Sequence, residues 1–356
     1  MSFSNTAIRA PRLAILANGV PLAGAMEAEI ASHNHDAADR FSARLALDGD
    51  PASMEFWANA MDILADIRFS LDGAVPQSLI LGAVDCVDID PVQRIARIEG
   101  RDLTARLIET RTQESFSNRT ASEIATILAG RHGLSPAVTA TTTQVGRYYQ
   151  DQHDRIVLDQ FSRALTEWDL LVWLANQEGF RVFVRGTTLY FQPAVAAPRI
   201  VPITSADVMD LRLNRALTLA RDIAVVVKSW NSRQQNAFTQ TAHAAGSGAG
   251  AGQKIVLVRP NLSPDQALKL AQSTLVELTR HRMVLNLTMP GDVALTPGDA
   301  LALSGTGSGF DQIYVIDSIQ RRLSVRHGFV QYVCARNDNL PAQASTPAAR
   351  VGSVTG

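Results

Sequence analysis

Residues 120–193 constrain the fold more than any other stretch of this chain, because their pattern specifies helix, helix and hairpin in order. The first helix begins at Thr120, which has the spacing of a capping box with Glu123 three residues later. Apolar residues then recur at helical spacing, and Gly133 supplies the left-handed residue that ends the helix. The pattern predicts the start of a compact α/β unit.

A second helix and a hairpin complete this unit. Thr166 caps the helix with Asp169 three residues on, and Gly179 ends it. Residues 180–185 and 189–192 alternate across a glycine turn, which predicts two paired strands.

Strand-like segments flank the α/β unit on both sides. About six strands precede it, joined by tight turns such as Asn18-Gly19 and Asp72-Gly73, and they predict a small β-barrel or rolled sheet. A second β-region begins near residue 208, contains a helix that starts at Ser263, and has a type II turn signal at Pro297-Gly298. Both ends could be barrels related by a distant repeat, although no sequence identity between them is evident.

The predicted fold class is mixed α+β and mainly β, with two β-barrel-like domains and an inserted small α/β domain. The predicted boundaries are 1–105 for the first barrel, 106–197 for the insert, 198–338 for the second barrel and 339–356 for an extended connector.

Composition narrows the function classes. Hydrophobic residues make up 46% of the 356 residues and charged residues 19%, as in a folded protein. The net charge of −1 argues against a protein that grips nucleic acid through bulk electrostatics. The chain has no apolar run of about 20 residues, so no membrane span is expected. Its short N-terminal apolar patch ends at Asn18-Gly19, which indicates a hairpin and not a signal sequence.

Cysteine, glycine and tryptophan residues have simple interpretations. Cys86 and Cys334 have no metal-ligand spacing and are expected to be buried free thiols, with a disulfide left open. The glycine-rich stretches 246–252 and 305–309 lack the lysine and following helix of a phosphate loop and are expected to be loops. The tryptophans are expected to be core or interface anchors; they are Trp57, Trp168, Trp173 and Trp230.

Two groups of residues resemble metal sites only weakly. His33, His35 and Asp36 include two ligands on one strand face, but no clear further ligands accompany them, so a polar loop is favoured. The run Asp85, Asp88 and Asp90 lacks the glycine and distal glutamate of a calcium loop and is expected to face solvent or a partner.

Catalytic signatures are absent from the sequence. Glu167 and Asp169 lie two residues apart on one helix, so their carboxylates point in different directions, and they are expected to complement the helix dipole. No Gly-x-Ser-x-Gly motif occurs. The prediction is therefore that the chain is not an enzyme and has no catalytic residues, no cofactor, no cofactor-binding residues and no metal-binding residues.

Several long segments resemble one family when taken in order. They are EGRDLTARLIETRTQESFSNRTA (99–121), TASEIATILAGRHGLSP (120–136), VGRYYQ (145–150), TEWDLLVWLANQEGF (166–180) and TTLYFQP (187–193). At these residues the chain resembles the phage late control D family, the hub proteins at the distal end of bacteriophage tails. The resemblance covers about two thirds of the chain.

The resemblance implies a virion structural protein of the tail baseplate or tail tip, made in the host cytoplasm. Such a hub is a homotrimer whose chains each give two tube domains, so that a threefold ring matches a sixfold tail tube on one side and a spike on the other. The implied partners are the tail tube protein, the spike protein, other baseplate proteins and a tape measure protein. DNA would pass through the channel at genome ejection without specific binding.

Three alternatives remain at this point. The chain could be the hub of a contractile injection system or of a domesticated tail. It could be a tail-associated peptidoglycan hydrolase. Residues 122–136 also resemble one helix of a LysM module, which would make the chain a wall-binding protein, but the downstream half of that motif is missing.

Overall fold

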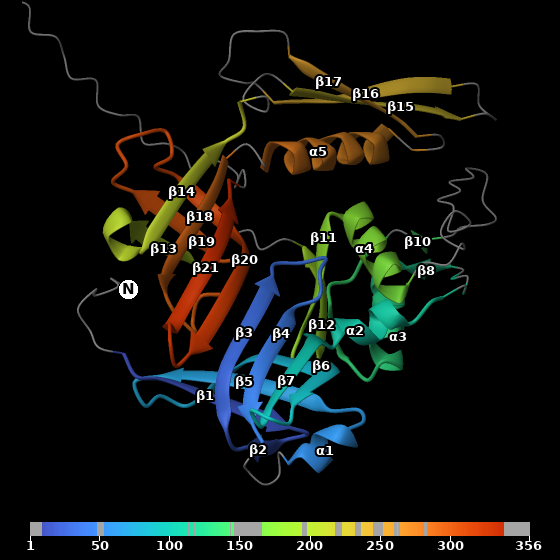
Figure 1. Ribbon diagram of the computed structural model, residues 1–356. Helices are drawn as coiled ribbons and strands as arrows, with labels where there is room; N and C mark the ends of the chain where they lie inside the picture. The colour runs from blue at the N-terminus through green and yellow to red at the C-terminus, as the bar shows by residue number, and fades with distance from the viewer. Residues whose placement is uncertain are drawn as a thin grey trace, which may run out of the picture.

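The computed structural model is drawn in Figure 1. It describes residues 9–47, 53–112, 114, 116, 118–142, 144–145, 166–193, 198–217, 223–231, 236–244, 252–259, 262, 264–280 and 283–337. The proposed Ser263 cap, the connector 339–356 and all but the last residue of the glycine-rich stretch 246–252 lie outside these residues.

Strands of the first β-region follow one another through short turns. They are β1 (Pro11–Ala17), β2 (Val20–Leu22), β3 (Ala25–His33), β4 (Arg40–Ala46), β5 (Leu64–Leu71), β6 (Gln77–Asp90) and β7 (Ile95–Asp102), with the short helix α1 (Met54–Ala58) before β5. Asn18, Gly19, Asp72 and Gly73 all have positive φ, as type I′ hairpin turns require, so both predicted turns are confirmed.

The α/β unit comes next in the chain. Its elements are α2 (Thr104–Glu109), β8 (Arg119–Thr120), α3 (Ala121–Arg131), β9 (Ser135–Val138), β10 (Gln144–Val145), α4 (Glu167–Glu178), β11 (Phe180–Arg185) and β12 (Thr188–Pro193). The capping boxes of Thr120 with Glu123 and of Thr166 with Asp169 are both present, and Gly179 is left-handed. The predicted helices and hairpin are thus confirmed.

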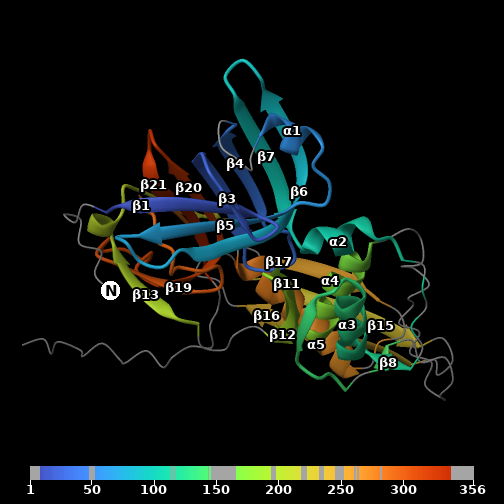
Figure 2. The ribbon, with the colours of Figure 1, turned by 90° about the horizontal axis from the view of Figure 1, so that it is seen from below.

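The second β-region carries an additional layer. Its strands are β13 (Ile200–Thr204), β14 (Asp210–Arg215), β18 (Met283–Pro290), β19 (Ala300–Ser304), β20 (Ile313–Ser324) and β21 (Gly328–Arg336), with the 3-10 helix η2 (Ser205–Asp207) after β13. The layer consists of β15 (Ile223–Asn231), β16 (Asn236–Ala244), β17 (Gln253–Val258) and α5 (Pro264–Arg280), and it has its own apolar core. Figure 1 shows α5 between this three-stranded sheet and the rest of the molecule, and in Figure 2, seen from below, the layer overlaps the α/β unit.

One large sheet joins the two β-regions. Its 13 strands include the path β14-β18-β21-β20-β3-β4-β7-β6-β5-β1-β2, and the connection between the regions is the antiparallel pair of β20 and β3. The fold is therefore mainly β. The pairings of the described strands leave this sheet open, so they do not give the two closed barrels that the sequence pattern predicts.

The two β-regions repeat the same strand order. The first reads β3-β4-β7-β6-β5-β1, and the second reads β14-β18-β21-β20-β19-β13. When the strands of each list are numbered by their order along the chain, both lists read second, third, sixth, fifth, fourth, first. The repeat is imperfect in one respect, because β1 pairs with β5 antiparallel whereas β13 pairs with β19 parallel. The distant internal repeat considered from the sequence thus has a counterpart in the topology.

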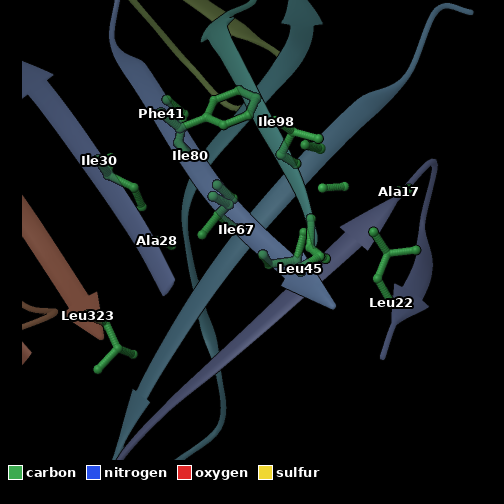
Figure 3. Close-up of a cluster of buried hydrophobic side chains, with 14 of the residues drawn as sticks. Ala17, Leu22, Ala28, Ile30, Phe41, Leu45, Ile67, Ile80, Ile98 and Leu323 are labelled. Atoms are coloured by element: carbon green, nitrogen blue, oxygen red, sulfur yellow. The ribbon is translucent and has the colours of Figure 1, made fainter. Parts of the chain in front are cut away.

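Each repeat folds around its own core. The first core includes Ile30, Phe41, Ile67 and Ile98, which are at most 4% exposed and point between the strands in Figure 3. The second is built on strands β18 to β21 and includes the fully buried Tyr314. Burying one isoleucine or leucine side chain contributes about 1.5–3 kcal/mol. Because each repeat buries several of them, each has a substantial core of its own.

The cysteines differ from the prediction of buried thiols. Both are free, but Cys86 is exposed and Cys334 is half-buried. Each lies in a strand at a position that alternates with the core-facing residues, which is why an apolar neighbourhood in the sequence gave the wrong expectation. Trp57 and Trp168 are buried as expected, and Trp173 packs against the core of the α/β unit.

Candidate functional site

The residues considered as metal ligands lie at the end of β3 and in the loop after it. His35 Nδ1 is 2.8 Å from a carboxylate oxygen of Asp36, and the Asp39 carboxylate accepts the backbone N–H of His33 at 2.7 Å. The interaction with Asp39 raises the pKa of His33. Among the described residues no group of three or more His, Cys, Asp or Glu side chains is arranged to hold a metal ion.

The aspartates of β6 have separate roles. Asp85 accepts two hydrogen bonds from Arg101, at 2.6 and 2.9 Å, and Asp90 accepts the backbone N–H groups of Val92 and Gln93 in the turn to β7. Asp85 and Asp88 are exposed, as predicted. This strand therefore presents a row of carboxylates at its outer surface and not a calcium loop.

Glu167 has a role that the sequence reasoning missed. Its side chain is fully buried, and its carboxylate accepts hydrogen bonds from Arg131 and, at 2.5 Å, from the Nε2–H group of His132. Arg131 also donates to Glu114 at 2.6 Å. The network ties the end of α3 to the start of α4, whereas Asp169 caps its own helix. The capping signals at 131–133 and 166–169 were visible, but nothing in the sequence shows that the two helix ends meet.

Charged residues also meet where the two repeats and the α/β unit touch, and two of them, Asp102 and Arg321, are buried. A cavity of about 250 Å³ is lined by residues of all three parts, among them Asp39, Asp102, Arg185 and Arg321. Arg321, 3% exposed, donates to the carbonyl groups of Asp292 and Leu295. Burial lowers the pKa of Arg321 to about 10. Burial, and next the Asp39 charge, raise the pKa of Asp102 to about 7.

A cleft separates the α/β unit from α5. It has a volume of about 360 Å³ and is lined by residues of α4 and α5, including Trp173, Gln177, Glu178 and Lys269. Burial raises the pKa of Glu178, and the charge of Lys269 opposes that shift. The cleft is therefore a seam between the α/β unit and α5.

The outer face of the large sheet, the one that points away from the cores, carries many charged side chains. It runs without interruption from β14 through β20 and β3 to β7, because the side chains that alternate with the core point to this side in both repeats. Arginines and carboxylates are interspersed on it; they are Arg40, Arg44, Arg97, Arg101, Arg212, Arg322 and Arg336 with Glu27, Glu29, Asp85, Asp88, Glu99, Asp210 and Asp317. The face is hollowed over β18, β20 and β21, where a depression of about 400 Å³ includes His33, Asn286 and Tyr332.

Ion pairs neutralise much of this face locally. Glu27 of β3 accepts two hydrogen bonds from Arg322 of β20, at 2.6 and 2.8 Å, which connects the two repeats. On β7, the Nη2 atom of Arg97 lies 2.6 Å from the Oε1 atom of Glu99. Because charges of both signs are mixed along the sheet, the face carries no large field of one sign.

One ion pair recurs at the same place in both repeats. β6 has a bulge between Val84 and Cys86, with Asp85 paired to Arg101 of β7 at 2.6 Å. β20 has a bulge between Ile316 and Ser318, with Asp317 paired to Arg336 of β21 at 3.0 Å. The strand that precedes β6 and the one that precedes β20 also begin alike, because Ile63 and Asp299 accept the backbone N–H of Val84 and Ile316. The two repeats therefore share detailed geometry as well as strand order.

Comparison with solved structures identifies the class of fold. The tail protein from Neisseria meningitidis MC58 superposes with a TM-score of 0.69 at 15% identity, covering 93% of this chain and 97% of that one. The 43 kDa tail protein of prophage MuSo2 from Shewanella oneidensis gives 0.67 at 16%, covering 92% and 98%. A type VI secretion system component from E. coli, described as similar to two tail proteins of bacteriophage T4, gives 0.57 at 12%, covering 92% and 77%. The chain thus has the fold of phage tail proteins and of this secretion component.

Sequence comparison adds a family. The model of the Alg8 N-terminal domain matches residues 85–324, which is more than half of the chain, and the chain belongs to that family. No curated protein matches the sequence. No helix of the described residues is long and apolar enough to cross a membrane.

Proposed function

We propose that this protein is the baseplate or tail-tip hub of a bacteriophage tail, of the late control D type. Three copies would form a ring that joins the sixfold tail tube to a threefold spike. The observation that carries the proposal is the repeated strand order: each chain holds two similar β-units, so a trimer presents six of them. The likeness of the fold to tail proteins supports the same assignment.

The domain division follows from this role. Residues 1–105 and 198–338 would be the two tube domains, residues 106–197 the insert outside the ring, and residues 339–356 the connector to the spike. The layer of β15–β17 and α5 interrupts the second tube domain between β14 and β18 and would lie beside the insert, because α5 shares the cleft with α4. Both additions would be available to neighbouring baseplate proteins.

The outer sheet face would line the channel. A surface that neutralises many phosphates binds DNA tightly, because it releases condensed counterions. Interspersed arginines and carboxylates, several of them already paired, offer few net charges for that purpose. Such a lining lets DNA slide past without being held, in a virion part that has no membrane span and no catalytic role.

A related candidate is the hub of a contractile injection or secretion system, and the likeness to the type VI secretion component favours it as the second choice. The two roles differ in what passes through the ring. Purification of the intact particle would separate them, since a phage hub copurifies with capsid and genome and an injection-system hub with a tail that lacks both.

Solution mass and electron microscopy of the purified protein test the hub. The expected result is three times the 38.4 kDa of the chain and a ring with a central opening. A monomer that digests purified cell walls would refute the proposal and revive the hydrolase. A monomer that only sediments with cell walls would refute it in favour of the wall-binding module.

A further inference from the structure

The two long strands β6 and β20 use their edges differently. On one side, each pairs with the strand that follows it: β6 with β7 from Gly82 to Asp90, and β20 with β21 from Val315 to Ser324. On the other side, the first half of each pairs with the preceding strand, β5 or β19. The second half of β20 then pairs with β3 through Ser318 to Ser324, whereas the corresponding half of β6, from Cys86 onward, pairs with no described strand on that side.

A second open edge lies at the far end of the sheet. β14 corresponds to β3 in the repeat, and among the described strands it pairs only with β18. The edge that β3 offers to β20 therefore has an unused equivalent in β14. Two of the open edges in the described sheet, those of β6 and β14, thus correspond to the two partners of the β3–β20 junction.

The shared bulge fixes how these edges would align. Counting from it, Cys86, Asp88 and Asp90 correspond to Ser318, Gln320 and Arg322. Counting from the β4 and β18 pairings, Glu29 corresponds to Arg212 and Ala31 to Asn214. Arg322 stands opposite Glu29 within the chain, so its counterpart Asp90 would stand opposite Arg212 of another chain. The two charges are again opposite in sign. The arginine now lies on β14, the counterpart of β3, whereas within the chain it lies on β20, the counterpart of β6.

We propose that β6 of one copy pairs antiparallel with β14 of the next copy, through residues 86–90 and 212–216, and repeats the β20–β3 junction between chains. The partner of each edge is a second copy of this chain. Contacts of this head-to-tail kind close into a ring when the rotation per copy permits. The inference rests on the proposed trimer and adds which strands make its interface.

The native Cys86 allows a direct test. The backbone N–H of Asn34 donates to the carbonyl of Asp317 at 2.8 Å, so the next pair, Ser318 with His33, is of the non-hydrogen-bonded kind. Its Cα atoms are separated by about 4.5 Å, a distance that a disulfide can span. The corresponding intermolecular pair is Cys86 with Ala216, and Cys86 is exposed.

The experiment oxidises full-length protein that carries Ala216→Cys and Cys334→Ser. The expected product is a disulfide-linked trimer on a non-reducing gel, lost on reduction, because each copy gives one thiol to each neighbour. Adding Cys86→Ser should abolish it. The register control, Asn214→Cys with Cys334→Ser, leaves position 214 opposite Asp88 and should cross-link more than about tenfold more slowly, since diagonal neighbours lie about 7–8 Å apart.

The outcomes separate the interface from the hub. Covalent trimers support the strand pairing, whether or not the protein later proves to act in a tail. A light-scattering trimer without the disulfide between positions 86 and 216 overturns this pairing and leaves the hub proposal in place. Covalent dimers that close on themselves, or no link in a protein that stays monomeric, overturn the pairing and the proposed ring together.

Discussion

Replacing Asp102 by asparagine should change how stability depends on pH. This carboxyl is 4% exposed, and its Oδ1 accepts the backbone N–H of Thr104 at 3.1 Å. Burial is the largest cause that raises its pKa from 3.8 to about 7. Between these two values the folded protein holds a proton that the unfolded chain has released, so the free energy of unfolding falls as pH rises through this window and levels off above pH 7.

The size of the effect follows from the same two values. The complete window corresponds to about 4 kcal/mol, of which about 2.5 kcal/mol falls between pH 5 and pH 8. Asp102→Asn keeps the oxygen that accepts from Thr104 and does not titrate. The variant should therefore gain about 2.5 kcal/mol relative to the parent protein between pH 5 and pH 8.

Urea unfolding followed by circular dichroism at both pH values measures this difference. Asp88→Asn is the matched control, because Asp88 is an exposed carboxylate on the neighbouring strand β6. That variant should differ from the parent by the same small amount at both pH values. If Asp102→Asn behaved like the control, the carboxyl would be ionised in the folded protein and the argument from burial would be wrong.

Three further substitutions test the packing. Glu167→Gln should lower the free energy of unfolding by about 2–4 kcal/mol, because it leaves Arg131 and His132 without their buried carboxylate, and a urea midpoint equal to that of the parent would contradict this role. Gly100→Ala should lower the free energy of unfolding by about 1–3 kcal/mol, since a Cβ there would lie 2.0 Å from the carbonyl oxygen of Ala83 and 2.5 Å from the Phe41 ring. Equal thermal midpoints for variant and parent would count against this expectation. Gly130→Ala, in α3 with open space around the new methyl group, should instead stabilise by about 0.5–1 kcal/mol in the same thermal melts.

Local signals in the sequence predicted the helices and most of the strands correctly. The capping boxes at Thr120 and Thr166 and the positive-φ residues at Asn18-Gly19 act within a few residues of themselves, so a linear pattern contains them. Mainly-β architecture followed from the alternation. The barrel closure did not follow, because it depends on which distant strands pair, and the β3–β20 pair joins residues almost 300 positions apart.

Features that depend on meetings between distant residues could not be predicted. The buried position of Glu167 arises because the end of α3 and the start of α4 converge, and the raised pKa of Asp102 arises from the packing of three parts of the chain around one cavity. The internal repeat left a faint trace in the sequence, in VDCVD at 84–88 and IDSIQ at 316–320. Only the structure shows that both segments lie at equivalent bulges, each with an Asp–Arg pair to the following strand.

The two junctions carry their opposite charges on exchanged strands, and this exchange would also decide which edges pair. Within the chain Arg322 of β20 faces Glu29 of β3, and in the proposed interface Asp90 of β6 would face Arg212 of β14. If β6 took the place of β20 beside β3, Asp90 would face Glu29. If β20 paired with β14 of another copy, Arg322 would face Arg212.

Both exchanged pairings place like charges opposite each other in an antiparallel ladder, which is unfavourable. Specificity of this kind comes from the penalty on the wrong partner as much as from attraction to the right one. Arg212→Glu should therefore weaken the assembly of intact copies, about fivefold for each interface if one unfavourable cross-strand pair costs about 1 kcal/mol. Dilution followed by light scattering would measure the change, and an unchanged dissociation constant would show that this pair does not set the order of the ring.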